Sequence, residues 1–269
     1  MGVDAFKTEK FPVVIFVPGM GEERQKYTIL CEELVSQGYV VLVLDQPYVA
    51  NFVKLSDGRR VVLTLKDVWE LPRDRDYRYQ YYDDAMIGAI GDVVYILDHL
   101  EEINEKELGG ICSGEVILMG HSFGGNVAHT LGFRDERIRA VVDIDSKITE
   151  RKIFGRVGVP PNLEGKPVLF IRGMMQYQEE GVLDELAKIS NSTIWAPDVQ
   201  HSAFSDQAYF ANKIQDFGKQ GFLSDFLNWF FKRGPHWASF DTDLGGKEVD
   251  AWFAEYRDRV VGWLKEQGD

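Results

Sequence analysis

The chain has 269 residues, of which 45% are hydrophobic, so it is long enough to bury one large core. Its 43 acidic and 30 basic residues give a net charge of -13 at pH 7. This charge argues against a nucleic-acid partner and against electrostatic docking on anionic membranes, because phosphate groups and anionic headgroups repel an acidic surface. No segment reaches the roughly 18 unbroken apolar residues of a transmembrane helix, so we predict no transmembrane segment.

The N-terminal segment MGVDAFKTEKFPVVIFV carries no recognisable secretory signal. Charged residues and Pro12 precede its short apolar run, and no small-residue cleavage site follows it. We therefore expect a cytoplasmic protein as the chain is written, with secretion from a longer precursor left open. Cys31 and Cys112 form no Cys-x-x-Cys pair, and we expect two buried free thiols.

Short apolar runs rich in β-branched residues alternate with segments of helical periodicity. The run VVIFV at 13–17 is predicted to be a strand, and YTILCEELVSQG at 27–38 a helix that ends at Gly38. The run YVVLVLD at 39–45 is nearly continuous in apolar residues. It is therefore predicted to be a strand covered on both faces.

The same alternation continues through the second half of the chain. An amphipathic helix over 84–105 is followed by the buried strand EVILMG at 115–120. Three further strands are predicted, with helices between them: RAVVDID at 139–145, PVLFIRG at 167–173 and STIWAP at 192–197. Such a sequence predicts an α/β fold with a mostly parallel central sheet and helices on both faces.

The chain contains no internal repeat, low-complexity tract or Pro/Gly linker, so residues 1–269 are predicted to form a single domain. Residues 51–82 are polar and turn-rich, include the short strand candidate RVVLTL, and are expected to cross the sheet edge. Residues 203–240 are rich in aromatic side chains. Within them, FLSDFLNWFFKR has helical spacing, which favours a core helix over a lipid interface. Both regions are expected to shape the substrate pocket.

The segment LMGHSFGGN contains the pattern Gly-x-Ser-x-Gly around Ser122. Ser122 directly follows the strand EVILMG and precedes a helical segment, which is the setting of a nucleophile elbow. Gly120 and Gly124 are the small residues that such a tight turn requires. The N–H of Phe123 opens the helix and is predicted to donate to a developing oxyanion. Ser122 is therefore the predicted nucleophile.

A second oxyanion donor is expected in the loop after the first strand, where the chain has the sequence VPGMGEERQKY. Gly19 and Gly21 let the backbone approach a substrate closely, and the N–H of Met20 between them is the predicted donor. A phosphate-binding glycine loop is the competing interpretation. The segment lacks the glycine and lysine spacing of such loops, and Glu22 and Glu23 would repel phosphate.

Five histidines compete for the role of general base. His201, in APDVQHSAF, follows the strand STIWAP in a loop and is the predicted base. His99 is expected within the long helix, and His121 beside the nucleophile with its side chain pointing away. His129 is expected on the helix after the elbow, and His236 in a late loop.

The acid of the triad should lie at the carboxyl end of a strand after the elbow. The segment AVVDIDSK offers Asp143 and Asp145, which strand alternation places on one face. Asp145 is predicted because it lies at the strand tip, where catalytic groups gather in open α/β sheets. Asp143 lies two residues earlier in the strand and is expected to form structural hydrogen bonds. Asp198 is disfavoured as the acid because it lies close to His201 in the same loop.

Five segments together resemble the secreted and intracellular type II platelet-activating factor acetylhydrolases, a family of α/β-hydrolases. They are FPVVIFVPGMGEERQKY, GHSFGGNVAHTL, AVVDID, KPVLFIRGMMQYQ and QHSAFSDQ, within roughly residues 11 to 232. The resemblance implies Ser122 as nucleophile, Asp145 as acid and His201 as base. It implies oxyanion N–H groups on Met20 and Phe123.

The chain also departs from that family. Pro18 stands where the family has the histidine of its Ser-His-Gly segment, so the support of the oxyanion hole differs. Residues 51–82 do not match well, which leaves acyl-pocket and leaving-group specificity open. No lipoprotein-binding surface carries over.

Together these features predict a serine carboxylic-ester hydrolase that forms an acyl-enzyme on short-chain acyl esters, with lipid-like or aromatic esters as substrates. No cofactor or metal is expected, since no Cys/His cluster has ligand spacing. An acyltransferase or a polyester (cutinase-like) hydrolase with the same triad is the alternative. A non-catalytic binding protein with this fold is disfavoured because all three triad residues are present. The sequence does not determine the natural ester or the oligomeric state.

Overall fold

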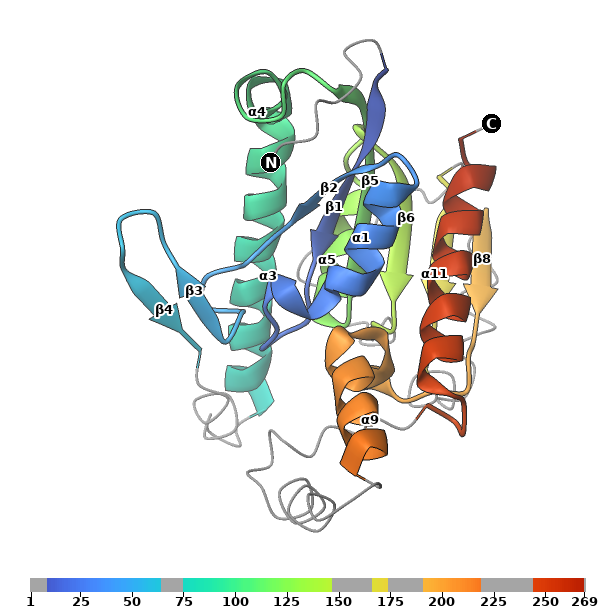
Figure 1. The fold of residues 1–269 in the computed structure, drawn as a ribbon. Helices are drawn as coiled ribbons and strands as arrows, with labels where there is room; N and C mark the ends of the chain where they lie inside the picture. Colours follow the sequence, from blue (N-terminus) through green and yellow to red (C-terminus); the bar gives the residue numbers. More distant parts are fainter. Residues whose placement is uncertain (1–8, 64–74, 147–165, 174–190, 219–243, 269) are drawn as a thin grey trace.

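The computed structural model describes residues 9–63, 75–146, 166–173, 191–218 and 244–268 (Figure 1). Its core is a six-stranded sheet in the order β2-β1-β5-β6-β7-β8, in which all neighbouring strands are parallel. The strands are β1 (Phe11–Val17), β2 (Val40–Val43), β5 (Cys112–His121), β6 (Ile138–Ile144), β7 (Val168–Ile171) and β8 (Ser192–Trp195). The predicted parallel α/β sheet is confirmed.

Strand β1 shows why the central strands are nearly continuous apolar runs. Val14 and Phe16 belong to one hydrophobic cluster, whereas Val13, Ile15 and Val17 belong to the cluster on the opposite face. All five side chains are fully buried. In a strand buried on both faces, neither set of alternate residues faces solvent, so all of these positions are apolar.

Helices cover both faces of the sheet, as predicted (Figure 1). The buried residues of α1 (Thr28–Ser36) and α11 (Val249–Glu266) belong to the first cluster. Those of α3 (Arg75–Asp98) and α5 (Phe123–Gly132) belong to the second. The site described below lies where the carboxyl ends of β1, β5, β6 and β8 meet loops and helix starts.

The four residues of strand β2 are only partly buried. The prediction that it is covered on both faces is confirmed, because Val41 and Val43 pack against the first hydrophobic cluster and Val40 and Leu42 against the second. Strand β2 lies at one edge of the sheet and β8 at the other, and each has a neighbouring strand on one side only. An apolar run reports the average burial of a segment and cannot distinguish an edge position from a central one.

The helix predicted over 84–105 is divided at His99 into α3 and α4 (Leu100–Lys106). The prediction that His99 lies inside a long helix was therefore wrong. Its backbone N–H donates to the carbonyls of both Tyr95 and Ile96, which tightens the last turn, and its Nδ1 lies 2.8 Å from the Tyr95 carbonyl oxygen. These contacts end α3 before the chain begins a new helix.

Part of the predicted excursion over 51–82 is a short antiparallel hairpin of β3 (Phe52–Lys54) and β4 (Arg60–Val62). Figure 1 shows the hairpin beside α3, apart from the main sheet. The later part of the strand candidate RVVLTL and residues 64–74 lie outside the described residues.

The start of the aromatic-rich region 203–240 overlaps two helical elements, η2 (His201–Phe204) and α9 (Asp206–Gly218). The segment FLSDFLNWFFKR lies outside the described residues. In the described ranges, each helix is either too short or too polar to span a membrane.

Neither cysteine forms a disulfide; Cys112 is buried and Cys31 is partly exposed. Burial raises the pKa of the Cys31 thiol to about 12, so this thiol stays protonated at neutral pH.

Candidate active site

Ser122 lies in a sharp turn between β5 and α5, with a φ of 55°. This positive φ is uncommon for a residue other than glycine. A Cβ on Gly120 would lie 2.2 Å from the Gly124 carbonyl oxygen, and a Cβ on Gly124 would lie 1.9 Å from that of Val17. The turn is therefore compatible only with glycine at the two positions that the sequence motif singles out.

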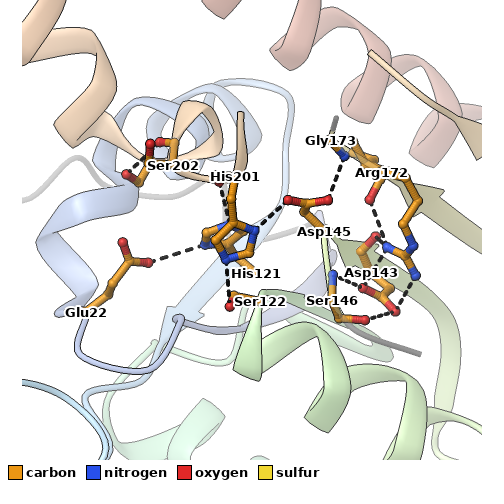
Figure 2. A network of polar contacts seen from close by, with 12 residues as sticks. Glu22, His121, Ser122, Asp143, Asp145, Ser146, Arg172, Gly173, His201 and Ser202 are labelled. Atoms are coloured by element: carbon orange, nitrogen blue, oxygen red, sulfur yellow. Dashed lines mark hydrogen bonds and ion pairs between the residues drawn. The ribbon is translucent and has the colours of Figure 1, made fainter. Parts of the chain in front are cut away.

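The side chains of Ser122, His201 and Asp145 lie in one continuous chain of contacts (Figure 2). Nε2 of His201 lies 2.9 Å from Oγ of Ser122, and Nδ1 lies 2.5 Å from Oδ2 of Asp145. Because a carboxylate only accepts, Nδ1 carries the proton and Nε2 is left to accept from the serine hydroxyl. This is the arrangement of a Ser-His-Asp triad. The structure thus brings together the three residues that the sequence singles out.

Asp145 is fully buried and is held by the backbone around it. Its own N–H donates to the Ile171 carbonyl over 2.7 Å, and its Oδ1 accepts from the Gly173 N–H over 2.6 Å. A Cβ on Gly173 would lie 3.0 Å from Oδ2 of Asp145, so the absent side chain leaves room for the carboxylate. These contacts fix the orientation of the carboxylate toward His201.

Asp143 lies in a separate buried cluster. Its carboxylate is 2.9 Å from a guanidinium nitrogen of Arg172, 2.8 Å from Nδ1 of His129 and 2.7 Å from Oγ of Ser146. Burial opposes ionisation, yet the charge of Arg172 and the hydrogen bond from His129 hold the pKa of Asp143 well below its usual range. Asp143 is structurally engaged, as expected from its depth in the strand.

The two predicted oxyanion donors lie in adjacent turns, since Val17 at the end of β1 pairs with Gly120. Phe123 is the first residue of α5, so its N–H is among those without an intrahelical acceptor. The Gly19 N–H donates to the Tyr27 hydroxyl.

On the other side of Met20, the Gly21 N–H donates to the Val49 carbonyl. Within the part of the chain that the structure describes, the Met20 N–H between these two glycines has no acceptor. The N–H groups on both sides of Met20 are therefore occupied, which agrees with the choice of Met20 as the predicted donor.

His121 was predicted to point away from the site, and this prediction was wrong. Its Nε2 lies 3.1 Å from the carbonyl oxygen of His201, and the two rings are 4.7 Å apart. Strand β5 continues through His121, so period-two alternation places its side chain on the same face as Ile117 and Met119. That face also holds Phe204 of the His201 loop.

His121 could therefore have been placed from the sequence if the predicted strand had been extended by one residue, because its alternating side chains then include His121. Two neighbours of His121, Glu22 and Tyr27, were missed as well: the Tyr27 hydroxyl lies 2.8 Å from its Nδ1 and the Glu22 carboxylate 3.3 Å. His236 lies outside the described residues. Among those that the structure does describe, no group of three or more His, Cys, Asp and Glu side chains could hold a metal ion.

The parallel sheet with helices on both faces is an α/β-hydrolase fold. A ferulic acid esterase from Streptomyces cinnamoneus has the same fold: it superposes with a TM-score of 0.66 at 22% identity, over 96% of this chain and 68% of that chain. The model of the family "Platelet-activating factor acetylhydrolase, isoform II" matches residues 3–47.

A probable 1-alkyl-2-acetylglycerophosphocholine esterase of Arthroderma benhamiae is 26% identical to this chain over 137 residues. The match spans 50% of this chain and 31% of that relative, so it covers about a third of the relative's length. Together with the family model, this relative confirms the predicted resemblance: parts of the chain are similar to the platelet-activating factor acetylhydrolases.

Proposed function

We propose that the protein is a carboxylic-ester hydrolase that acts through an acyl-enzyme on Ser122. The observation that carries this proposal is the unbroken chain of contacts from Ser122 Oγ through the His201 imidazole to Asp145. The similarity to the acetylhydrolases supports it, because the matched relative is itself named an esterase.

In the acylation step, His201 Nε2 accepts the Ser122 proton while Oγ attacks the ester carbonyl carbon. Asp145 holds the Nδ1–H tautomer and stabilises the imidazolium that forms. The N–H groups of Met20 and Phe123 receive the oxyanion, and each such donor contributes about 3 kcal/mol in comparable sites. The imidazolium then returns its proton to the leaving alkoxide, and the alcohol departs.

Deacylation repeats the same proton transfers with water as the nucleophile. His201 Nε2 takes a proton from the attacking water, the tetrahedral intermediate collapses, and Ser122 Oγ leaves with the proton that His201 returns. The products are a carboxylic acid and the free enzyme. All of these steps use side chains and backbone groups of this chain.

We propose short-chain acyl esters as the substrate class. The support is the similarity to the acetylhydrolases, since the name of the matched relative specifies an acetyl ester of a glycerophospholipid. Lipid-like or aromatic alcohols are the leaving groups that we expect.

The experiment is hydrolysis of p-nitrophenyl esters from acetate to laurate by wild type, Ser122→Ala and Ser36→Ala. Ser36 is an exposed serine on α1 and serves as the matched control. Wild type and Ser36→Ala should hydrolyse the short esters fastest, and Ser122→Ala should lose about 10⁴-fold or more in kcat. Wild type that is inactive over the whole series would contradict the proposal. Added alcohol separates hydrolysis from acyl transfer, because an acyltransferase would form a new ester.

A further inference from the structure

The Glu22 carboxylate is nearly buried in the turn between β1 and η1 (Arg24–Tyr27), with 12% of its side chain exposed. Its Oε2 accepts a hydrogen bond from the hydroxyl of Tyr27 and lies 3.3 Å from Nδ1 of His121. Figure 2 shows Glu22 directed at His121, on the side of the triad opposite Asp145. The mechanism above assigns no role to this carboxylate.

Tyr27 and His121 connect Glu22 to two separate parts of the site. The Tyr27 hydroxyl accepts from the Gly19 N–H over 3.1 Å, directly before Met20. The Nε2–H of His121 donates to the carbonyl oxygen of His201 over 3.1 Å, and its ring packs against the His201 ring. One carboxylate is therefore linked both to the turn with the predicted oxyanion donor and to the loop with the predicted base.

The charge on Glu22 is maintained by its surroundings. Burial opposes ionisation, but the hydrogen bond and charge of His121, together with the charge of Lys26, hold the pKa of Glu22 below its ordinary value. An ionised carboxylate accepts only, so the Tyr27 hydroxyl donates to it and keeps its own oxygen for the Gly19 N–H.

The backbone of the turn is also shaped around this carboxylate. A Cβ on Gly19 would lie 2.7 Å from Oε2 of Glu22 and 3.4 Å from Nδ1 of His121. The Glu22 carboxylate therefore occupies the space that a side chain at position 19 would fill. This observation is independent of the hydrogen bonds, and it indicates that the turn accommodates an inward-facing carboxylate.

We propose that Glu22 is a positioning residue for ester hydrolysis, which holds the Met20 turn through Tyr27 and the His201 loop through His121. This inference rests on the proposed function. Both positioned groups act on charge that develops in the transition state, so a misplaced turn or loop lowers kcat and leaves KM nearly unchanged.

The test compares Glu22→Ala and Glu22→Gln with the matched control Glu23→Ala. Glu23 is the next residue in the same turn, and its carboxylate pairs with Lys26 at 3.4 Å. Active sites are counted with a fluorophosphonate that labels an activated serine, so that rates are expressed per functional site and a misfolded fraction does not count as a catalytic defect.

Glu22→Ala should lower kcat per titrated site by roughly tenfold to a hundredfold, with KM changed less than about twofold. Glu22→Gln should recover most of the loss, because its amide oxygen can still accept from Tyr27. Glu23→Ala should match wild type. The positioning role is wrong if Glu22→Ala matches Glu23→Ala, if only KM changes, or if glutamine is no better than alanine.

The wild-type enzyme separates this inference from the proposed function. Wild type that neither hydrolyses the esters nor reacts with the fluorophosphonate contradicts the proposed function, and the positioning role fails with it. Active wild type with unaffected Glu22 variants contradicts the positioning role alone.

Discussion

Asp143 and Asp145 are two residues apart at the end of β6, yet their carboxylates contact different partners. Asp143 binds Arg172 in a fully buried ion pair, whereas Asp145 contacts His201. The φ of 52° at Asp145 turns the backbone out of the strand, so the alternation that would place both side chains on one face ends before it. We expect substitutions at these positions to separate catalysis from stability.

Asp145→Asn should lower kcat by about 10⁴-fold, because an asparagine amide can hold the imidazole in the wrong tautomer and cannot stabilise its charged form. The fold should remain intact, since the amide oxygen can still accept from the Gly173 N–H. Steady-state hydrolysis of a short p-nitrophenyl ester, together with urea unfolding, measures both properties. An active Asp145→Asn variant would contradict the assignment of the acid.

Asp143→Asn should instead destabilise the protein by about 3–5 kcal/mol, because it leaves the buried guanidinium of Arg172 without a counter-charge. Asp98→Asn is the matched control: Asp98 pairs with Arg137 at the surface, with 54% of its side chain exposed, and should change the free energy of unfolding by about 1 kcal/mol or less. Urea unfolding at neutral pH measures both. Unchanged stability with lost activity in Asp143→Asn would mean that the two aspartates have exchanged roles.

The carboxylate of Asp206 predicts a pH dependence of stability. It is buried at the start of α9 and accepts from the Ile29 N–H at the start of α1. Burial raises the pKa of Asp206 from its ordinary value of 3.8 to about 6, against the lowering effect of the Ile29 and Thr28 N–H groups. Because the folded state holds this proton more tightly than the unfolded state, the stabilisation is complete below about pH 4 and is lost as the pH rises through about 6.

As the pH rises from about 4 to about 7, wild type should therefore lose up to about 3 kcal/mol in free energy of unfolding relative to Asp206→Asn. Comparing the two proteins at each pH removes the contributions of the other carboxylates. Urea unfolding at several pH values measures this difference. A difference that stays constant with pH would show that the pKa of Asp206 is not raised.

The parts of the fold that could be predicted are those determined by residues close together in the sequence. Apolar runs and helical spacing located the six strands, and the Gly-x-Ser-x-Gly turn located Ser122, because a strand, a tight turn and a helix start are set by neighbouring residues. The prediction of His201 has a related basis: few histidines compete, and this one lies in the loop that follows β8. The order of strands in the sheet is not local, and for that reason the edge position of β2 was missed.

The surroundings of the triad were missed for the same physical reason. The contact between Glu22 and His121 joins residues 99 positions apart, and the contact between Tyr27 and His121 joins residues 94 apart. Neither pair has a sequence period or a motif that links it. Glu22 could be recognised only as an acidic residue that disfavours phosphate, and its inward direction follows from the missing side chain at Gly19.

Glycine substitutions provide a test of the elbow that does not depend on catalysis. Gly124→Ala should destabilise the protein by about 2 kcal/mol or more, because the new Cβ would lie 1.9 Å from the Val17 carbonyl oxygen and backbone must move. Gly88→Ala is the matched control on α3. Its Cβ would meet no atom within 4 Å, and alanine in a helix interior is favoured over glycine by about 0.5–1 kcal/mol.

Thermal and urea unfolding of the two variants should therefore change in opposite directions, with Gly88→Ala more stable than wild type and Gly124→Ala less stable. Gly120→Ala should behave like Gly124→Ala, since its Cβ would lie 2.2 Å from the Gly124 carbonyl oxygen. A Gly124→Ala variant with wild-type stability would mean that the turn and β1 are further apart than described. The close approach of the two backbones, and with it the placement of Ser122 beside the Met20 turn, would then be wrong.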